Sequence, residues 1–104
     1  MALLSMKTFR AEPGREDDLV QLMRDAKKEM LRVDSRRTVR VFRVVDGPDA
    51  GNVSIAIEYE GLEAFREIRA KEQTDAGWQA IGDRANGPDR PAETLRYVQM
   101  EEIA

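Results

Sequence analysis

Glu58 is the side chain of this sequence whose chemical type best suits it to move a proton. It lies in the alternating segment 53–60, where every second side chain points to the same side. A carboxyl group enclosed in an apolar cavity has a raised pKa, which suits proton transfer near neutral pH. A structural role is the alternative, in which Glu58 forms a salt bridge to Arg40, Lys7 or Arg96 across a sheet.

The sheet face that carries Glu58 would supply further groups to such a cavity. Alternation along the predicted strands nominates as its lining Lys7, Phe9, Arg40, Phe42, Ser54, Ala56 and either Arg96 with Val98 or Leu95 with Tyr97. In this arrangement Lys7 or Arg96 would hold an oxyanion. Trp78, the only tryptophan, would close one end of the pocket, or else it packs in the core as a lone helical tryptophan usually does.

Cysteine and histidine are both absent from the sequence. The lack of cysteine excludes disulfides, thiolate nucleophiles and cysteine metal sites. The lack of histidine removes the usual general base near pH 7, a common haem ligand and the commonest zinc ligand. We therefore expect no metal site and no cofactor.

Length and composition fit one globular domain spanning residues 1–104. The chain is 36% charged, and its net charge of −3 does not attract nucleic acid. We expect Arg36 and Arg37 to be solvated in a turn. No stretch approaches the roughly 20 apolar residues that cross a bilayer. We expect a cytoplasmic protein that has no membrane or nucleic-acid partner.

Hydrophobic periodicity predicts the elements that must position these side chains. Apolar residues in steps of three and four indicate a helix over 15–33, which has acidic residues in its first turn and basic residues toward its end. Alternation and β-branched residues predict strands over 3–11, 38–45, 53–60 and 94–100. The loop 46–52 makes the second and third strands a hairpin.

The region from Gly61 to about residue 84 is helical, as one kinked helix or as two helices with Thr74 as a cap. The element order is therefore β-α-β-β-α-β, which predicts a ferredoxin-like α+β fold with a four-stranded antiparallel sheet. Its helices cover one face of the sheet. Phe9 and Phe42 would leave the other face too apolar for a monomer, so we expect a homodimer stacked sheet to sheet.

Two segments carry a resemblance to a known superfamily. Lys7-Thr8-Phe9 stands ahead of Pro13-Gly14 and an acidic helix start, and 75–81 reads Asp-Ala-Gly-Trp-Gln-Ala-Ile. The chain resembles the dimeric α/β-barrel proteins, which include antibiotic-biosynthesis monooxygenases and NIPSNAP proteins. NIPSNAP proteins have Arg-Thr-Tyr at the first segment. The cofactor-free monooxygenases have an asparagine where this chain has Thr74, four residues before its tryptophan.

The residues and the resemblance together lead to two hypotheses. The first is a homodimer that binds a small apolar or aromatic molecule between sheet and helices. If it is an enzyme, it is a cofactor-free monooxygenase or an isomerase in which Glu58 moves the proton. The alternative is a non-catalytic dimer that binds a ligand or another protein. Convergent polar groups around a ligand-sized void would favour the enzyme, and a filled apolar interface would favour the alternative.

Overall fold

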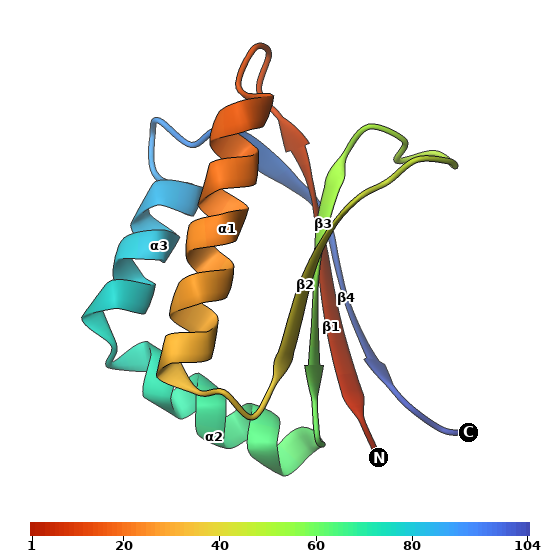
Figure 1. Cartoon of the computed structure of the whole chain (residues 1–104), viewed down its shortest axis with the longest axis vertical. Coiled ribbons are helices and arrows are strands. Elements are labelled where there is room, and N and C mark those ends of the chain that lie inside the picture. Colours follow the sequence, from red (N-terminus) through yellow and green to blue (C-terminus); the bar gives the residue numbers. More distant parts are fainter.

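Strands and helices follow one another in the predicted order. The computed structural model describes all 104 residues. Its elements are β1 (Leu3–Ala11), α1 (Glu16–Val33), β2 (Thr38–Arg43), β3 (Val53–Tyr59), α2 (Leu62–Gln73), α3 (Ala76–Asn86) and β4 (Ala92–Glu101). The sheet is antiparallel with strand order β2-β3-β1-β4, and all three helices lie on one side of it (Figure 1). The prediction of a ferredoxin-like α+β fold is confirmed.

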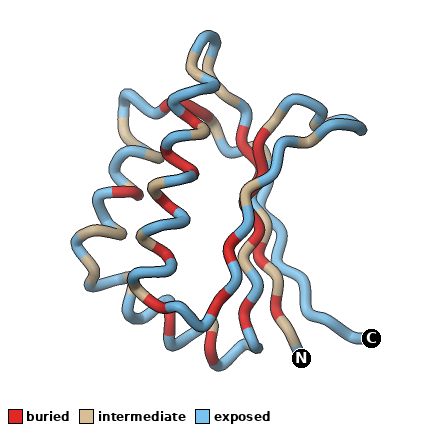
Figure 2. The backbone as a smooth tube through the Cα atoms, viewed as in Figure 1, coloured by how far each residue is buried: buried red, intermediate tan, exposed pale blue.

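Helix α1 covers the sheet with the face that periodicity predicts. Its buried residues are Leu19, Leu22, Met23, Ala26 and Met30. Together with Phe9, Val39, Val53 and Ile55 from the sheet, they form the main hydrophobic core. Figure 2 shows the buried positions of α1 on its sheet side, while β4 is exposed along most of its length. The helices therefore leave the β4 side of the sheet the least covered.

The second helical region consists of two helices, because Asp75 stops one and starts the next. The Asp75 carboxylate accepts a hydrogen bond from the backbone N–H of Trp78 at 2.8 Å, the usual N-cap geometry. It also binds the Arg32 guanidinium of α1, and these two contacts lower the pKa of Asp75. The prediction of Thr74 as the cap is wrong by one residue. The Thr74 hydroxyl donates instead to the Lys71 carbonyl at the end of α2.

The register of the strands assigns each side chain to one face of the sheet. Residues directly opposite each other in an antiparallel pair share a face. Lys7 lies opposite Ile55 and Tyr97, so these three face the helices. Thr8 lies opposite Ser54 and Arg96, so these three residues are on the other side of the sheet. A bulge in β4 shifts the pairing between Thr8 and Phe9, so that Thr94 and Tyr97 both face the helices.

The face of the sheet that no helix covers, here called the open face, is partly apolar. Phe42, Val98 and Met100 are 48%, 41% and 42% exposed on it. The β2–β3 loop and the C-terminal end of β4 both lean away from the helices and flank this face (Figure 1). Asp49 of that loop binds Arg96 on β4 at 2.8 Å. Phe9, which was predicted to lie here, is instead buried in the core on the helix side.

A buried ion network joins the α1–β2 turn to α2 and β3. The Arg37 side chain is fully buried and donates to the Met30 carbonyl at the end of α1, to Glu72 and to the Tyr59 hydroxyl. The expectation that Arg37 is solvated is wrong. Beside it, Asp34 is 4% exposed and accepts hydrogen bonds from Arg36 and Lys71, which hold the pKa of Asp34 well below its usual range.

Asp34→Asn should destabilise the fold and make the free energy of unfolding less dependent on pH in the acidic range. A carboxyl group whose pKa is lowered in the folded state contributes stability above its unfolded pKa and loses it as the pH falls. At pH 7 we expect a loss of about 2 kcal/mol in the free energy of unfolding, because charge-assisted hydrogen bonds are lost. Urea titrations at neutral and acidic pH measure this. The matched control is Asp83→Asn, since Asp83 is exposed and forms no ion pair. An unchanged acid profile in Asp34→Asn would contradict this account.

Candidate functional site

A cavity of about 300 Å³ lies between the sheet and the three helices. Thirteen of its twenty lining residues are hydrophobic, and its volume is at the lower end of the range for small-molecule pockets. Its walls come from β1, β3 and β4 on one side and from the helices on the other. The lining is Ser5, Met6, Lys7, Phe9, Met23, Ala26, Met30, Ile55, Ile57, Tyr59, Phe65, Arg69, Glu72, Trp78, Ile81, Gly82, Ala85, Asn86, Thr94 and Tyr97.

Small residues on the helices leave this space unfilled. Ala26 of α1 and Gly82 and Ala85 of α3 are at lining positions where a larger side chain would occupy the cavity. A Cβ atom added at Gly82 would meet no other atom within 4 Å. The helix therefore has room at this position, and it keeps a glycine that costs about 1 kcal/mol in helix propensity relative to alanine.

Lys7 brings a positive charge to the cavity from the middle of β1. Its ammonium nitrogen lies 5.9 Å from the ring centroids of both Phe9 and Tyr97, within the range of cation–π attraction. None of the ion pairs in the structure involves Lys7. The Lys7 charge is therefore available to a molecule in the cavity.

Tyr59 and Glu72 line the cavity where it meets the buried network of Arg37. The Arg37 guanidinium donates to Glu72 at 3.0 Å and to the Tyr59 hydroxyl oxygen at 3.4 Å. Burial raises the pKa of the Tyr59 phenol, and the hydrogen bond from Arg37 opposes that rise. Since its oxygen accepts from Arg37, the hydroxyl keeps its own hydrogen for donation. The Tyr59 ring is fixed edge-to-face on Phe65, with centroids 5.1 Å apart.

The structure divides the predicted site residues between two faces of the sheet. Lys7, Phe9 and Trp78 meet in the cavity. The remaining four are on the open face: Arg40, Phe42, Glu58 and Arg96. The prediction that all seven line one site is wrong. The strand β1 has apolar residues on both faces, so alternation alone did not fix its orientation, and an error of one residue exchanges the faces.

Glu58 lies outside this cavity, and none of the three predicted salt bridges forms. It is exposed on the open face, away from the cavity, and it forms no ion pair. Its three predicted partners are engaged elsewhere: Arg96 binds Asp49, Arg40 lies 5.9 Å from the Phe42 ring centroid, and Lys7 faces the helices. The cavity therefore has no carboxylate from β3.

Sequence reasoning missed three charged residues in or beside the cavity: Arg37, Arg69 and Glu72. For Arg37 a signal existed. It stands two residues before Val39, which is buried in the core, so the alternation of β2 extended backward places Arg37 on the same inward face. Arg69 and Glu72 lie in a helix whose exposed and inward faces both carry charged side chains, and periodicity gives no such signal there.

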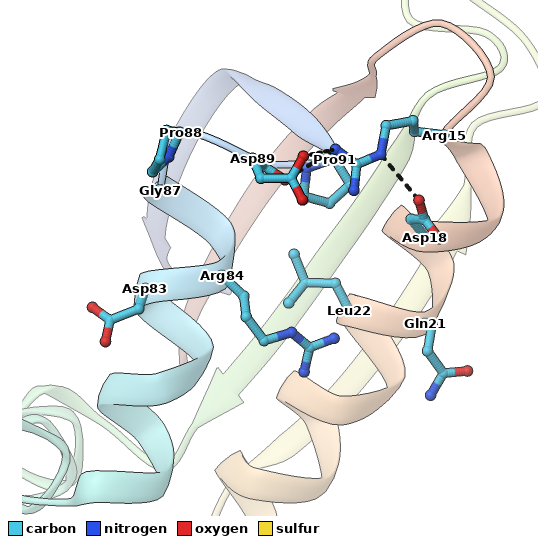
Figure 3. Close-up of a pocket in the computed structure, with 10 residues that line it drawn as sticks. All are labelled: Arg15, Asp18, Gln21, Leu22, Asp83, Arg84, Gly87, Pro88, Asp89 and Pro91. Atoms are coloured by element: carbon cyan, nitrogen blue, oxygen red, sulfur yellow. Dashed lines mark hydrogen bonds and ion pairs between the residues drawn. The ribbon is translucent and has the colours of Figure 1, made fainter.

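A second hollow lies between the start of α1 and the end of α3 (Figure 3), and it is polar. Leu22 is its only hydrophobic lining residue. Arg15 spans it, binding Asp18 at 3.0 Å and Asp89 at 3.1 Å, so it fastens the α3–β4 loop to α1. Arg84 is bound to Asp25. Since its cations already have partners, this hollow has a structural explanation and is a weaker candidate for a ligand.

No group of three or more histidine, cysteine, aspartate or glutamate side chains is arranged to hold a metal ion. None of the three helices has both the length and the apolar character that crossing a membrane requires.

The sequence matches no protein-family model and no curated protein. Solved structures, in contrast, match almost the whole chain. A variant of SnoaB, a cofactor-independent oxygenase from Streptomyces nogalater, has a TM-score of 0.71 at 8% identity, covering 97% of this chain and 92% of SnoaB. An uncharacterised NIPSNAP domain protein from Burkholderia xenovorans has a TM-score of 0.70 at 17% identity, covering 98% and 95%. A candidate antibiotic biosynthesis monooxygenase from Deinococcus radiodurans has a TM-score of 0.70 at 17% identity, covering 98% and 93%.

These likenesses show a shared fold. The resemblance predicted from Lys7-Thr8-Phe9, Pro13-Gly14 and 75–81 is thereby confirmed at the level of architecture. A fold hosts many functions, and identities this low do not carry a reaction or a ligand from one protein to another.

Proposed function

We propose that this protein binds a small, largely apolar or aromatic molecule in the cavity between its sheet and its helices. One observation supports this above the others: a ligand-sized, mainly hydrophobic space is lined by Lys7, whose ammonium has no ion-pair partner, and by Tyr59, whose hydroxyl hydrogen remains available for donation. A few polar groups that converge on an apolar pocket are the usual composition of a small-molecule site.

Cofactor-free oxygenation is the second candidate, and the fold shared with the oxygenase SnoaB favours it. Such a reaction uses O2 as the oxidant and an electron-rich phenolic substrate as the reductant: one oxygen atom enters the substrate and the other leaves as water. Lys7 would stabilise its phenolate oxygen, and the Tyr59 hydroxyl would donate a hydrogen bond. The cavity provides no uncompensated carboxylate as a base, because Glu72 is bound to Arg37. For this reason we place binding first and turnover second.

The assembly we propose is a homodimer that buries the open face of each sheet against the other. The exposed Phe42, Val98 and Met100 give this face an apolar centre. Arg40 and Glu58 carry opposite charges on the same face, and neither has an ion-pair partner within the chain. A two-fold axis presents each surface to its own copy, so self-complementary charges and a shared apolar centre suit a second copy of this chain.

Filling the cavity at Gly82 should abolish binding without harming the fold. The probe is N-phenyl-1-naphthylamine, an uncharged fluorescent aromatic molecule. Trp78 lies in the cavity wall, so energy transfer from its excited indole to the probe measures binding. Gly82→Leu places a side chain in open space, so we expect the affinity for the probe to fall by about tenfold or more while the circular dichroism spectrum is retained.

Gly82→Ala is the matched control for this experiment. It adds one methyl group, so the affinity for the probe should stay within about twofold, while the unfolding free energy rises by up to about 1 kcal/mol through helix propensity. If the wild-type protein does not bind the probe, or if Gly82→Leu binds it as well as the wild type does, the cavity is not a binding site.

A further inference from the structure

The charged groups around the cavity do not balance. Only three charged residues line it: Lys7, Arg69 and Glu72. The Glu72 carboxylate is already neutralised by Arg37, which lies 3.0 Å away and has a fully buried side chain. Two positive charges are left, in a protein whose net charge is −3. The local charge of the cavity is thus opposite in sign to that of the whole molecule.

The two cations approach from opposite walls and rest on aromatic rings. Lys7 projects from β1 over Phe9 and Tyr97. Arg69 projects from α2, with its guanidinium carbon 5.7 Å from the Phe65 ring centroid. Neither cation has a carboxylate partner. Aromatic contacts hold both charges beside the cavity and leave their N–H groups free to donate.

Nine of the seventeen lysine and arginine side chains bind a carboxylate, and none of these nine lines the cavity. Arg15, Arg32 and Arg36 each bind two carboxylates. Even the buried Arg37 has a carboxylate partner. A chain with twenty acidic side chains could readily place one beside Lys7 or Arg69, yet none lines the cavity apart from the neutralised Glu72.

We infer that the ligand of this cavity is a monoanion: a compact apolar or aromatic body that carries one acidic group, such as a carboxylate or a sulfonate. This inference rests on the proposed function, because it names the class of molecule that the same cavity takes. The apolar body would fill the hydrophobic part of the cavity. The acidic group would accept charge-assisted hydrogen bonds from Lys7 and Arg69, which are stronger than bonds between neutral groups.

A matched pair of fluorescent probes measures the contribution of the acidic group to affinity separately from that of the apolar body. 1-Anilinonaphthalene-8-sulfonate has the same aromatic body as N-phenyl-1-naphthylamine plus one sulfonate group. Lys7→Met removes the charge and keeps an unbranched apolar chain. We expect it to weaken sulfonate binding by about tenfold, the effect of losing one charged hydrogen bond, and to leave the affinity for the neutral probe within about twofold.

Three more variants test whether the loss of sulfonate binding is specific to the cations that line the cavity. Arg69→Met should weaken sulfonate binding by about threefold to tenfold. Lys7 and Arg69 are both exposed, so solvent screens the charge of each. Lys7→Arg restores the charge and should restore most of the affinity. Lys27→Met removes an exposed, unpaired charge from α1 away from the cavity, and it should change neither affinity.

The two proposals fail in different ways. If the wild type binds the neutral probe, but Lys7→Met and Arg69→Met leave the affinity for the sulfonate unchanged, the cavity binds ligands and the inferred anion preference is wrong. If Lys27→Met weakens sulfonate binding as much as Lys7→Met does, the preference is only a general effect of surface charge. If neither probe binds the wild type, the proposed function fails and the anion inference fails with it.

Discussion

Arg37→Met should lower the free energy of unfolding by about 3 to 5 kcal/mol, the usual result of removing one partner from a buried ion pair. The side chain of Arg37 is fully buried, and it makes three kinds of contact. It closes the C-terminal end of α1 through the Met30 carbonyl, balances the charge of Glu72, and binds the Tyr59 hydroxyl. A small domain has only about 5 to 15 kcal/mol of stability, so the loss would be a large share of it. Urea unfolding followed by Trp78 fluorescence measures the effect.

A double-mutant cycle shows how much of that loss comes from an unpaired charge. Arg37→Met leaves the Glu72 carboxylate, whose side chain is 13% exposed, without its partner. Adding Glu72→Gln removes the orphaned charge, so the double variant should be more stable than Arg37→Met alone. Arg37→Lys keeps the charge but has no planar fork to bind Met30 and Glu72 together, and its stability should be intermediate. A loss below about 1 kcal/mol for Arg37→Met would be in the range of an exposed pair and would contradict the buried network.

Phe42→Asp should convert the proposed dimer to a monomer, with the dissociation constant rising by about a hundredfold or more. Phe42 is 48% exposed on the open face, beside Arg40. In a two-fold dimer the substitution places a carboxylate on both copies, and each must be desolvated against an apolar surface. Native mass spectrometry and sedimentation at micromolar concentration report the assembly state.

The control for this variant is Leu31→Asp. Leu31 is also a partly exposed hydrophobic residue, but it lies on α1, on the other side of the molecule from the open face. Leu31→Asp makes the same change in charge and should leave the proposed dimer intact. Phe42→Ser removes the ring without adding a charge and should weaken the dimer less than Phe42→Asp does. A wild-type protein that is monomeric at micromolar concentration would refute the proposed assembly.

The elements that could be predicted were those whose two faces differ in sequence. Helix α1 has one apolar stripe, and β3 alternates between apolar and polar residues, so both agree with the structure to within one residue. In β1 the apolar residues Leu3 and Phe9 lie on one face and Leu4 and Met6 on the other. No pattern in the strand distinguishes the helix side from the open side, and only the pairing with β3 and β4 settles it.

The candidate site was harder to predict because a cavity forms only where the surrounding side chains are too small to fill the space. Lys7 could be nominated from its place in the predicted strand, and Trp78 because it is the only tryptophan. The space itself depends on small side chains at Ala26, Gly82 and Ala85 meeting across three elements far apart in the sequence. Charge compensation of Glu72 by Arg37 likewise depends on tertiary contact, so the net charge of the cavity could not be obtained from composition.

The alternation of β1 has an evolutionary consequence. Lys7 faces the cavity and the adjacent Thr8 faces the open side, so neighbouring codons encode residues on opposite surfaces of one sheet. A substitution at Lys7 or Phe9 alters the cavity side, and one at Leu4 or Thr8 alters the opposite side. Selection can therefore change one surface while drift or conservation acts independently on the other. A single-residue deletion within β1 would exchange both sets at once, so this strand tolerates substitutions far better than changes in length.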